Sequence, residues 1–155
     1  LTIVNKFFEV IKPNYALFGI KDFQQLCLIY TKLSPLHGTS IIPVETARDP
    51  SGLALSSRNK LLNDDQRFIA SKIYEGLKLL EKNIKEDPEI NYINFLEDFY
   101  KDYNSLEIEY IFLENTSIFD ENERLISKLL NNKNQVIMVA AKVGNIRLID
   151  NLLIS

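Results

Sequence analysis

The sequence predicts an α/β fold in two parts. Over the first third, helical segments with one apolar face alternate with short apolar runs, which is typical of helices packed on a parallel sheet. Further on, two helical segments precede strand-like segments, and Gly144-Asn145 joins the last two strands as a hairpin turn would. We therefore expect an α/β part over residues 1–46 and a small α+β domain, helices plus an antiparallel sheet, over residues 47–155.

The elements of the first part follow from the spacing of apolar residues and from the positions of Pro and Gly. Asp22 can cap the second helix with its side chain, and Pro43 marks an edge or a bulge of the second strand. Two strands are too few for a stable parallel sheet, so this part looks like the end of a larger α/β domain. In order, the expected elements are a helix over 2–12, a strand over 15–18, a helix over 22–33, a loop over 34–39 and a strand over 40–46.

In the second part, residues 48–52 are rich in turn formers and residues 53–60 show no clear period. Asn63 predicts the start of a long helix, because its side chain can cap the first turn and Gln66 stands three residues on, as in a capping box. Pro88 suits the first position of the next helix. The remaining expected elements are a strand over 106–110 with one exposed face, a helical segment over 118–130, a central strand over 136–143 and a strand from 146, in which Arg147 and Asp150 form a hairpin ion pair.

Composition excludes several classes of protein. The 18 Lys and Arg against 21 Asp and Glu give a net charge of -3, which argues against a nucleic-acid binder that works by neutralising phosphates. Cys27 is the single cysteine, so an internal disulfide is excluded, and we expect a buried thiol in a cytoplasmic protein. His37 is the single histidine, which excludes a zinc site with two imidazoles, and we expect it in a surface loop.

A first candidate site lies in residues 18–25, where the first strand ends and a helix begins. In open α/β sheets, ligands bind at this carboxyl edge. Gly19 lets a ligand approach the backbone, Lys21 supplies a mobile charge suited to phosphate, and Asp22 can accept hydrogen bonds from ribose hydroxyls. Gln25 follows one helical turn later. The alternative is a solvated Lys-Asp pair at a helix start, with Asp22 as a simple cap.

A second candidate site is the irregular segment that contains Ser56, Ser57 and Arg58. A guanidinium can bind a polyphosphate through two hydrogen bonds, and the two hydroxyls can donate to it. The alternative is a polar loop before a helix, with the serines as turn formers. Neither of the two common glycine-rich phosphate-binding motifs, Gly-x-Gly-x-x-Gly and the Walker loop, occurs in the sequence.

Taken together, three segments resemble the pantothenate synthetase (pantoate–β-alanine ligase) family. They are FGIKDFQQL at 18–26, RDPSGLALSSRN at 48–59 and AAKVGNIRLIDN at 140–151. The resemblance implies the C-terminal portion of the enzyme: the end of a Rossmann-like nucleotidyltransferase domain over 1–46, then an α+β lid domain over 47–155. It implies that ATP and pantoate form pantoyl adenylate with Mg²⁺, that β-alanine then gives pantothenate, and that the parent enzyme is a homodimer.

The resemblance also implies roles for individual residues. Lys21 contacts phosphate, Asp22 contacts ribose, Gln25 holds pantoate and Ala47 touches adenine through its backbone. Mg²⁺ is bound through the nucleotide phosphates, with no protein ligand. The implied ATP-binding residues are Gly19, Ile20, Lys21, Asp22, Ala47, Leu55, Ser56, Ser57 and Arg58, and the implied catalytic residues are Lys21, Ser56, Ser57 and Arg58.

The sequence departs from the family pattern at several places. Ile20 stands where the family usually has Glu or Gln. The His-x-Gly-His motif of the family's first ATP segment and an earlier substrate-binding Gln are absent from these 155 residues. We therefore expect a C-terminal portion of the enzyme that is inactive alone. The alternative is a non-catalytic module of this fold that binds a nucleotide or a partner; a different nucleotidyltransferase of the superfamily would leave the Arg-Leu-Ile-Asp-Asn segment unexplained.

Overall fold

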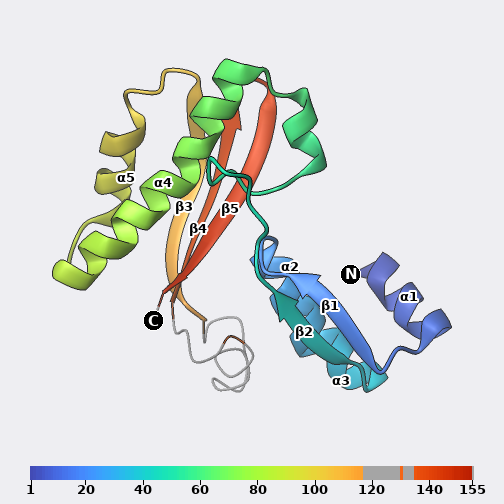
Figure 1. Ribbon diagram of the computed structural model, residues 1–155. Helices are drawn as coiled ribbons and strands as arrows, with labels where there is room; N and C mark the ends of the chain where they lie inside the picture. The colour runs from blue at the N-terminus through green and yellow to red at the C-terminus, as the bar shows by residue number, and fades with distance from the viewer. Residues whose placement is uncertain (117–129, 131–134, 155) are drawn as a thin grey trace. The chain divides into compact units, whose positions relative to one another are not determined.

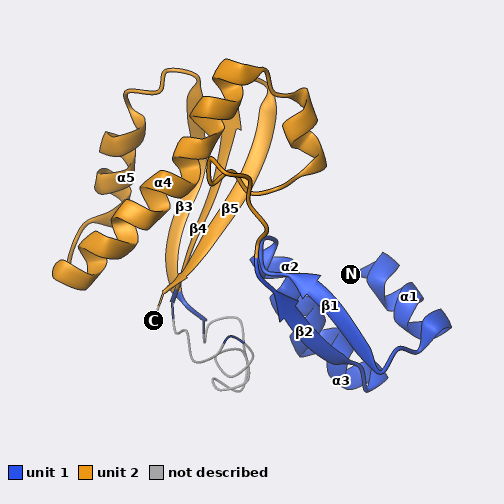
Figure 2. Cartoon of the chain, in the orientation of Figure 1, with its two compact units in different colours: residues 1–45, 115–135, 155 blue, residues 46–114, 136–154 orange. Residues whose placement is uncertain are grey.

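The computed structural model describes residues 1–116, 130 and 135–154, which fall into two compact units (Figures 1 and 2). One unit contains Leu1–Glu45, and the other contains Thr46–Glu114 and Val136–Ile154. A two-stranded parallel sheet belongs to the first unit and a three-stranded antiparallel sheet to the second, which confirms the predicted α/β class. The helical segment expected over 118–130 lies outside the described residues, apart from Leu130.

In the first unit, the two strands run parallel and in register. Tyr15 lies opposite Ser40 and Gly19 lies opposite Val44, so both strands end at the same edge of the sheet. The amide of Ile20 extends this ladder by donating to the Val44 carbonyl at 2.8 Å. In order, the elements are α1 (Thr2–Ile11), β1 (Tyr15–Gly19), α2 (Phe23–Leu28), a π-helical segment (Ile29–Leu33), α3 (Ser34–His37) and β2 (Ser40–Val44).

The helix that follows β1 is longer than the sequence predicts. The loop expected over 34–39 is wrong in its first four residues, because Ser34–His37 form α3 directly after the π-helical segment. Pro35 sits in the first turn of α3, where its missing N–H costs no hydrogen bond. Gly38 ends the helix with a φ of 64°, a left-handed conformation that glycine adopts without strain. The apolar face is buried as expected at Phe23, Leu26, Cys27, Ile29 and Leu33.

In the second unit, two helices pack on one face of the antiparallel sheet, with α4 across the strands and α5 beside it (Figure 1). The strand order β3-β4-β5 makes β4 the central strand, as predicted, and the Gly144-Asn145 turn joins it to β5 in the predicted hairpin. The elements are a 3-10 helix (Ser57–Leu61), α4 (Asp64–Glu86), α5 (Tyr92–Tyr100), β3 (Leu106–Asn115), β4 (Gln135–Val143) and β5 (Ile146–Ile154). The core includes Leu77, Leu80, Leu96, Ile137, Val139 and Ala141.

The start of α4 confirms the predicted capping box. The Asn63 side chain accepts from the Gln66 amide at 2.8 Å, and the Gln66 side chain accepts from the Asn63 amide at 3.0 Å. The helix start expected at Pro88 is wrong. Instead α5 begins at Tyr92, because the Asn91 side chain caps it by accepting from the amide of residue 94 at 3.0 Å.

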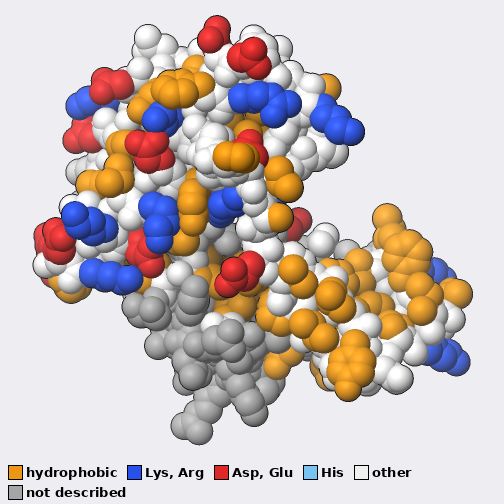
Figure 3. Space-filling model, viewed as in Figure 1, with side chains coloured by type: hydrophobic (Ala, Val, Ile, Leu, Met, Phe, Trp, Pro, Cys, Tyr) orange, Lys and Arg blue, Asp and Glu red, His pale blue; other side chains and the backbone are white. Residues whose placement is uncertain are grey.

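The two units differ in surface chemistry. Charged side chains of both signs cover the second unit, while hydrophobic side chains gather over the first (Figure 3). None of the described helices is long and apolar enough to cross a membrane. The exposed large hydrophobic residues of the first unit are Leu1, Ile3, Phe7, Val10, Ile11, Tyr15, Leu17, Leu28, Leu36, Ile42 and Val44.

Candidate functional site

The first group of candidate residues follows the carboxyl end of β1. Gly19 is the last residue of the strand and is exposed, and no atom lies within 4 Å of the position that a Cβ would take. Lys21 is half-buried, and Asp22 and Gln25 are exposed. The strand end and the first turn of α2 thus bring together a glycine, a lysine, a carboxylate and an amide.

The role of Asp22 as a helix cap is wrong. Its side chain makes no capping hydrogen bond, and its φ and ψ are -95° and 71°. Only the backbone of Asp22 serves the helix, because its carbonyl accepts from the Leu26 amide at 3.0 Å. The exposed carboxylate is therefore not used by the helix end and is available to a ligand.

The second group of candidate residues lies on a short antiparallel bridge in the second unit. Arg48 pairs with Ala54 in this bridge. The Leu55 amide donates to the Ala47 carbonyl at 2.9 Å, and the Asp49 amide donates to the Leu53 carbonyl at 3.0 Å. The bridge thus joins two candidate residues, Ala47 and Leu55, that are separated in sequence.

A tight turn connects the two sides of this bridge. The Asp49 carboxylate accepts from the Ser51 hydroxyl at 2.6 Å and from the Ser51 amide at 2.9 Å. The hydroxyl of Ser51 is the main cause that lowers the pKa of Asp49. Gly52 has a φ of 88°, and a Cβ there would lie 3.1 Å from the Tyr74 ring. The turn therefore requires glycine at this position.

The predicted phosphate-binding residues follow the bridge. Leu55 is 55% exposed, and Ser57 and Arg58 are exposed too. The Ser56 hydroxyl caps the 3-10 helix by accepting from the Arg58 amide at 3.2 Å, so the segment is more regular than its lack of period suggests. The Arg58 guanidinium donates to the Arg147 carbonyl at 3.3 Å. An exposed hydroxyl-rich turn with one guanidinium is suited to bind an anion.

Asn59 is a structural residue of this loop to which the sequence assigned no role. It is 6% exposed, and its side-chain amide donates to the Ala54 carbonyl at 3.0 Å. The Asn59 carbonyl accepts from Arg67 of α4 at 2.7 Å. The side-chain oxygen Oδ1 of Asn59 is buried and has no hydrogen-bond partner among the described atoms. Asn59 thus closes the Leu55–Arg58 loop at its base, and the apolar residues at 53–55 were the only sequence signal of its burial.

The ion pair expected between Arg147 and Asp150 is wrong. Asp150 pairs with Arg48 at 2.6 Å, and Arg147 pairs with Glu109 at 2.6 Å. The physical reason is the period of a β-strand: residues three apart in β5 lie on opposite faces of the sheet. The exposed fractions agree, since the Asp150 side chain is 5% exposed and the Arg147 side chain is 44% exposed.

Glu109 is expected to titrate below its ordinary pKa of 4.5. The Arg147 hydrogen bond is the main cause that lowers this pKa, and Lys142 at 3.2 Å acts in the same direction. Because folding lowers the pKa of Glu109, the pair contributes fully to stability at pH values above the ordinary pKa. This contribution is lost as the pH falls through the lowered pKa. Carbon-detected NMR titration checks this, and Arg147→Met is expected to raise the Glu109 pKa toward 4.5. Titration of Glu109 at its ordinary value in the unsubstituted chain would contradict the assignment.

Comparison with known proteins places this α/β chain in one family. Over residues 1–153 it matches the family model described as pantoate-beta-alanine ligase. The chain belongs to the pantoate-beta-alanine ligase family, which confirms the resemblance seen in the sequence.

Relatives and solved structures agree with this family. Pantothenate synthetase from Methylobacillus flagellatus is 35% identical over 153 residues, which are 97% of this chain and 53% of that protein. Pantothenate synthetase from Coprothermobacter proteolyticus is 36% identical over 99% of this chain and 53% of that protein. Pantoate-beta-alanine ligase from Francisella tularensis, complexed with beta-gamma ATP and beta-alanine, is 32% identical with a TM-score of 0.69 over 98% of this chain and 48% of that chain. Pantothenate synthetase from Thermus thermophilus is 26% identical with a TM-score of 0.78 over 98% of this chain and 54% of that chain. The chain thus spans about half the length of the relatives it matches.

Proposed function

We propose that this chain forms part of an ATP-dependent ligase that condenses pantoate and β-alanine to pantothenate. The observation that carries the proposal is the family match over residues 1–153. The complex of the Francisella tularensis relative with beta-gamma ATP and beta-alanine supports the choice of substrates. We propose a cytoplasmic enzyme, since the ligase consumes ATP, and the family resemblance favours a homodimer.

In the first unit, the proposed roles follow from the chemistry of each side chain. Lys21 neutralises phosphate charge as a mobile ammonium, and Asp22 accepts hydrogen bonds from the ribose hydroxyls. Gln25 both donates to and accepts from pantoate through its amide. Gly19 lets the nucleotide approach the end of β1, and Ile20 contributes its backbone only, since its side chain has no polar atom.

In the second unit, the Ala47 backbone contacts adenine and the Leu55–Arg58 loop binds the triphosphate. The hydroxyls of Ser56 and Ser57 donate to phosphate oxygens, and Arg58 exchanges the Arg147 carbonyl for phosphate. This exchange is favourable because a phosphate group carries negative charge and can bind the guanidinium through two hydrogen bonds, whereas the carbonyl is neutral and accepts one. The loop is therefore suited to close on a nucleotide.

The reaction proceeds in two steps. A carboxylate oxygen of pantoate attacks the α-phosphorus of ATP, the bond to the bridging oxygen breaks, and pyrophosphate leaves. The amine of β-alanine then attacks the acyl carbon, loses a proton, and AMP leaves. Both steps depend mainly on positioning and on neutralisation of charge at phosphate, which Lys21, the serines and Arg58 supply.

Mg²⁺ is proposed to enter with the nucleotide. Among residues 1–116, 130 and 135–154, no group of three or more His, Cys, Asp or Glu side chains could hold a metal ion. We propose that phosphate oxygens hold the ion, because Mg²⁺ prefers oxygen ligands and commonly binds through substrate phosphates. Lys21 and Arg58 are each proposed to contact phosphate oxygens through their own charge.

The proposal is tested with a chimera. The part of the Methylobacillus flagellatus enzyme that this chain does not match is joined to residues 1–155, and pantothenate formation is measured with pantoate, β-alanine and MgATP. We expect turnover that depends on all three substrates. The 155-residue chain alone is expected to give no pantoate-dependent exchange between ATP and pyrophosphate, because it lacks the His-x-Gly-His motif.

The intact relative serves as the positive control for the chimera. A folded chimera that binds ATP and forms no pantothenate would contradict the ligase and support the alternative, a non-catalytic nucleotide-binding module. Exchange activity of the isolated chain would show that its own residues suffice for adenylation.

A further inference from the structure

A largely buried ion pair lies beside the proposed nucleotide-binding residues. The two terminal nitrogens of Arg48 each donate to one carboxylate oxygen of Asp150, at 2.6 Å and 2.9 Å. The side chains are 16% and 5% exposed, so water has little access to the pair. Two parallel hydrogen bonds fix the plane of the guanidinium as well as its position. The pair thus joins the segment at residue 48 rigidly to β5, 102 residues later in the chain.

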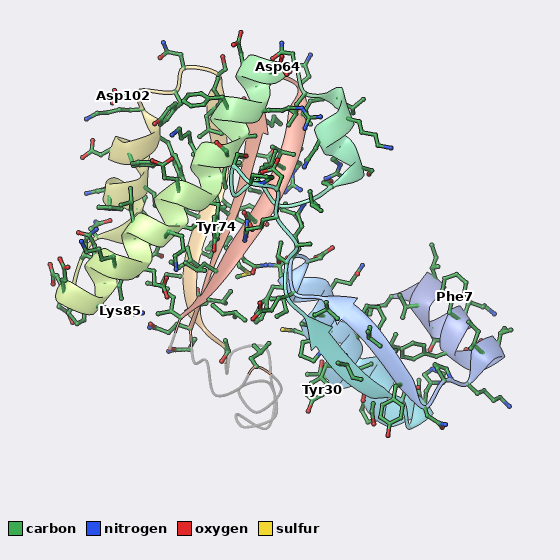
Figure 4. The ribbon with its side chains drawn as sticks, viewed as in Figure 1. Phe7, Tyr30, Asp64, Tyr74, Lys85 and Asp102 are labelled. Atoms are coloured by element: carbon green, nitrogen blue, oxygen red, sulfur yellow. The ribbon has the colours of Figure 1, made fainter. Side chains whose placement is uncertain are left out.

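Arg48 makes further contacts to three parts of the second unit. Its guanidinium donates to the Gly52 carbonyl at 3.1 Å and to the Asn151 carbonyl at 3.4 Å. The ring of Tyr74 on α4, labelled in Figure 4, stacks on the same group, with 3.5 Å between the Arg48 Cζ and the ring centroid. Because the aromatic face attracts a cation, Tyr74 holds Arg48 in the plane that meets Asp150. The guanidinium therefore ties the turn, the last strand and the long helix to one another.

The backbone at Arg48 sets the proposed ATP contacts. Arg48 pairs with Ala54 in the antiparallel bridge. This pairing fixes the backbone of the neighbouring residues Ala47 and Leu55. Ala47, proposed to contact adenine, precedes Arg48 directly and accepts from the Leu55 amide at 2.9 Å. Leu55 is the first residue of the proposed triphosphate loop. A shift of Arg48 would thus displace both contacts at once.

Stability alone is a weak reason for such a pair. Burying two charges costs desolvation energy, and well-packed apolar residues of the same size often stabilise a protein as much or more. An ion pair with two parallel hydrogen bonds does supply directionality, because both bonds form only when the guanidinium and the carboxylate lie in one plane. The pair is therefore better explained by its geometry than by its energy, because Ala47 and Leu55 need a fixed backbone position to contact ATP.

We propose that Arg48 and Asp150 are positioning residues that hold Ala47 and Leu55 in the arrangement that binds ATP. The inference rests on the proposed function of these two residues. Asp150 acts through Arg48, and neither residue touches the reacting atoms. Tyr74 supports the pair from α4.

The test uses Asp150→Asn and Arg48→Lys in the chimera described above, which contains all of residues 1–155. Each variant keeps the approximate size of the side chain and removes the paired hydrogen bonds. Glu75→Gln is the matched control, since it breaks the Lys72–Glu75 pair, whose carboxylate is 50% exposed, on the same helix as Tyr74. Amide hydrogen exchange at Leu55 reports whether the bridge is formed, and exchange at Val139 in β4 reports global stability. Nucleotide binding is measured by titrating MgATP and following the NMR signals of the Leu55 and Asp49 amides, which donate across the bridge.

We expect exchange at Leu55 to quicken about tenfold or more relative to Val139 in both variants, and MgATP to bind about tenfold more weakly. The control is expected to change neither. Exchange at Leu55 that rises only in step with Val139, or unchanged MgATP affinity in a loosened bridge, would overturn the inference. If one variant does not fold, the other carries the same comparison.

Failure of the proposed function would look different. An unsubstituted chimera whose NMR signals at Leu55 and Asp49 do not respond to MgATP would overturn the ATP role of Ala47 and Leu55, and with it the purpose assigned to the pair. The exchange data would in that case still show whether Arg48 and Asp150 order the bridge. The two results are therefore separable in one set of samples.

Discussion

Lys21→Ala in the chimera is expected to slow pantoate-dependent exchange between ATP and pyrophosphate by about 100- to 1,000-fold. Removing one group that stabilises charge in a transition state typically costs this much. Lys21 is half-buried just after β1, outside the apolar core, so the free energy of unfolding is expected to fall far less than the activation barrier rises. Lys21→Arg keeps the charge in another geometry and should retain part of the rate.

The control for this prediction is Lys6→Ala. Lys6 belongs to the same unit, and its side chain is 73% exposed in α1. It should leave both the exchange rate and the thermal midpoint near those of the unsubstituted chimera. An exchange rate in Lys21→Ala within about twofold of the starting protein would refute the phosphate role, since a loss of about 0.4 kcal/mol is too small for a direct contact to charge.

Gly76→Ala is expected to destabilise the second unit by about 2–3 kcal/mol. Gly76 is buried on α4, and a Cβ there would lie 2.5 Å from the Tyr100 hydroxyl oxygen and 2.8 Å from two ring carbons. That hydroxyl donates to the Ile73 carbonyl at 2.8 Å, so the ring cannot move without losing a buried hydrogen bond. The intrinsic preference of a helix for Ala over Gly, about 1 kcal/mol, offsets part of the cost.

Urea unfolding followed by circular dichroism measures this effect. Glu75→Ala, on an exposed position of the same helix, is the control and should stay within about 0.5 kcal/mol. Adding Tyr100→Phe to Gly76→Ala removes the closest clash, so the double variant should lose less than the sum of the single ones. A fully additive pair, or a Gly76→Ala chain as stable as the starting protein, would show that α4 and α5 are not held at this spacing.

Much of the fold could be predicted because its signals are local. The capping box at Asn63, the Gly144-Asn145 hairpin and the alternation along β3 each depend on residues within a few positions of one another. The start of α5 could not be predicted in this way. Pro88 and Asn91 both carry plausible signals for a helix start, and the side chain that actually reaches the first turn decides between them.

The second group of candidate residues shows the same division. Its serines and arginine are visible in the sequence as a polar irregular segment. The partner of Asp150 could not be predicted from the sequence, because Arg48 lies 102 residues away along the chain. Strand geometry excludes Arg147 by placing it on the opposite face of β5, and the fold then brings Arg48 from the other end of the unit to the buried face.

By itself, the sequence determined the fold class and the family, and it predicts phosphate and ribose contacts at Lys21, Asp22 and Arg58. Only the tertiary structure decided that Arg48 pairs with Asp150, that Asn59 closes the loop and that Gly76 admits Tyr100. The physical reason is the distance along the chain between the residues that interact. Caps, turns and apolar periods arise from neighbouring residues, whereas buried charges and close packing depend on contacts between segments that meet only in the folded chain.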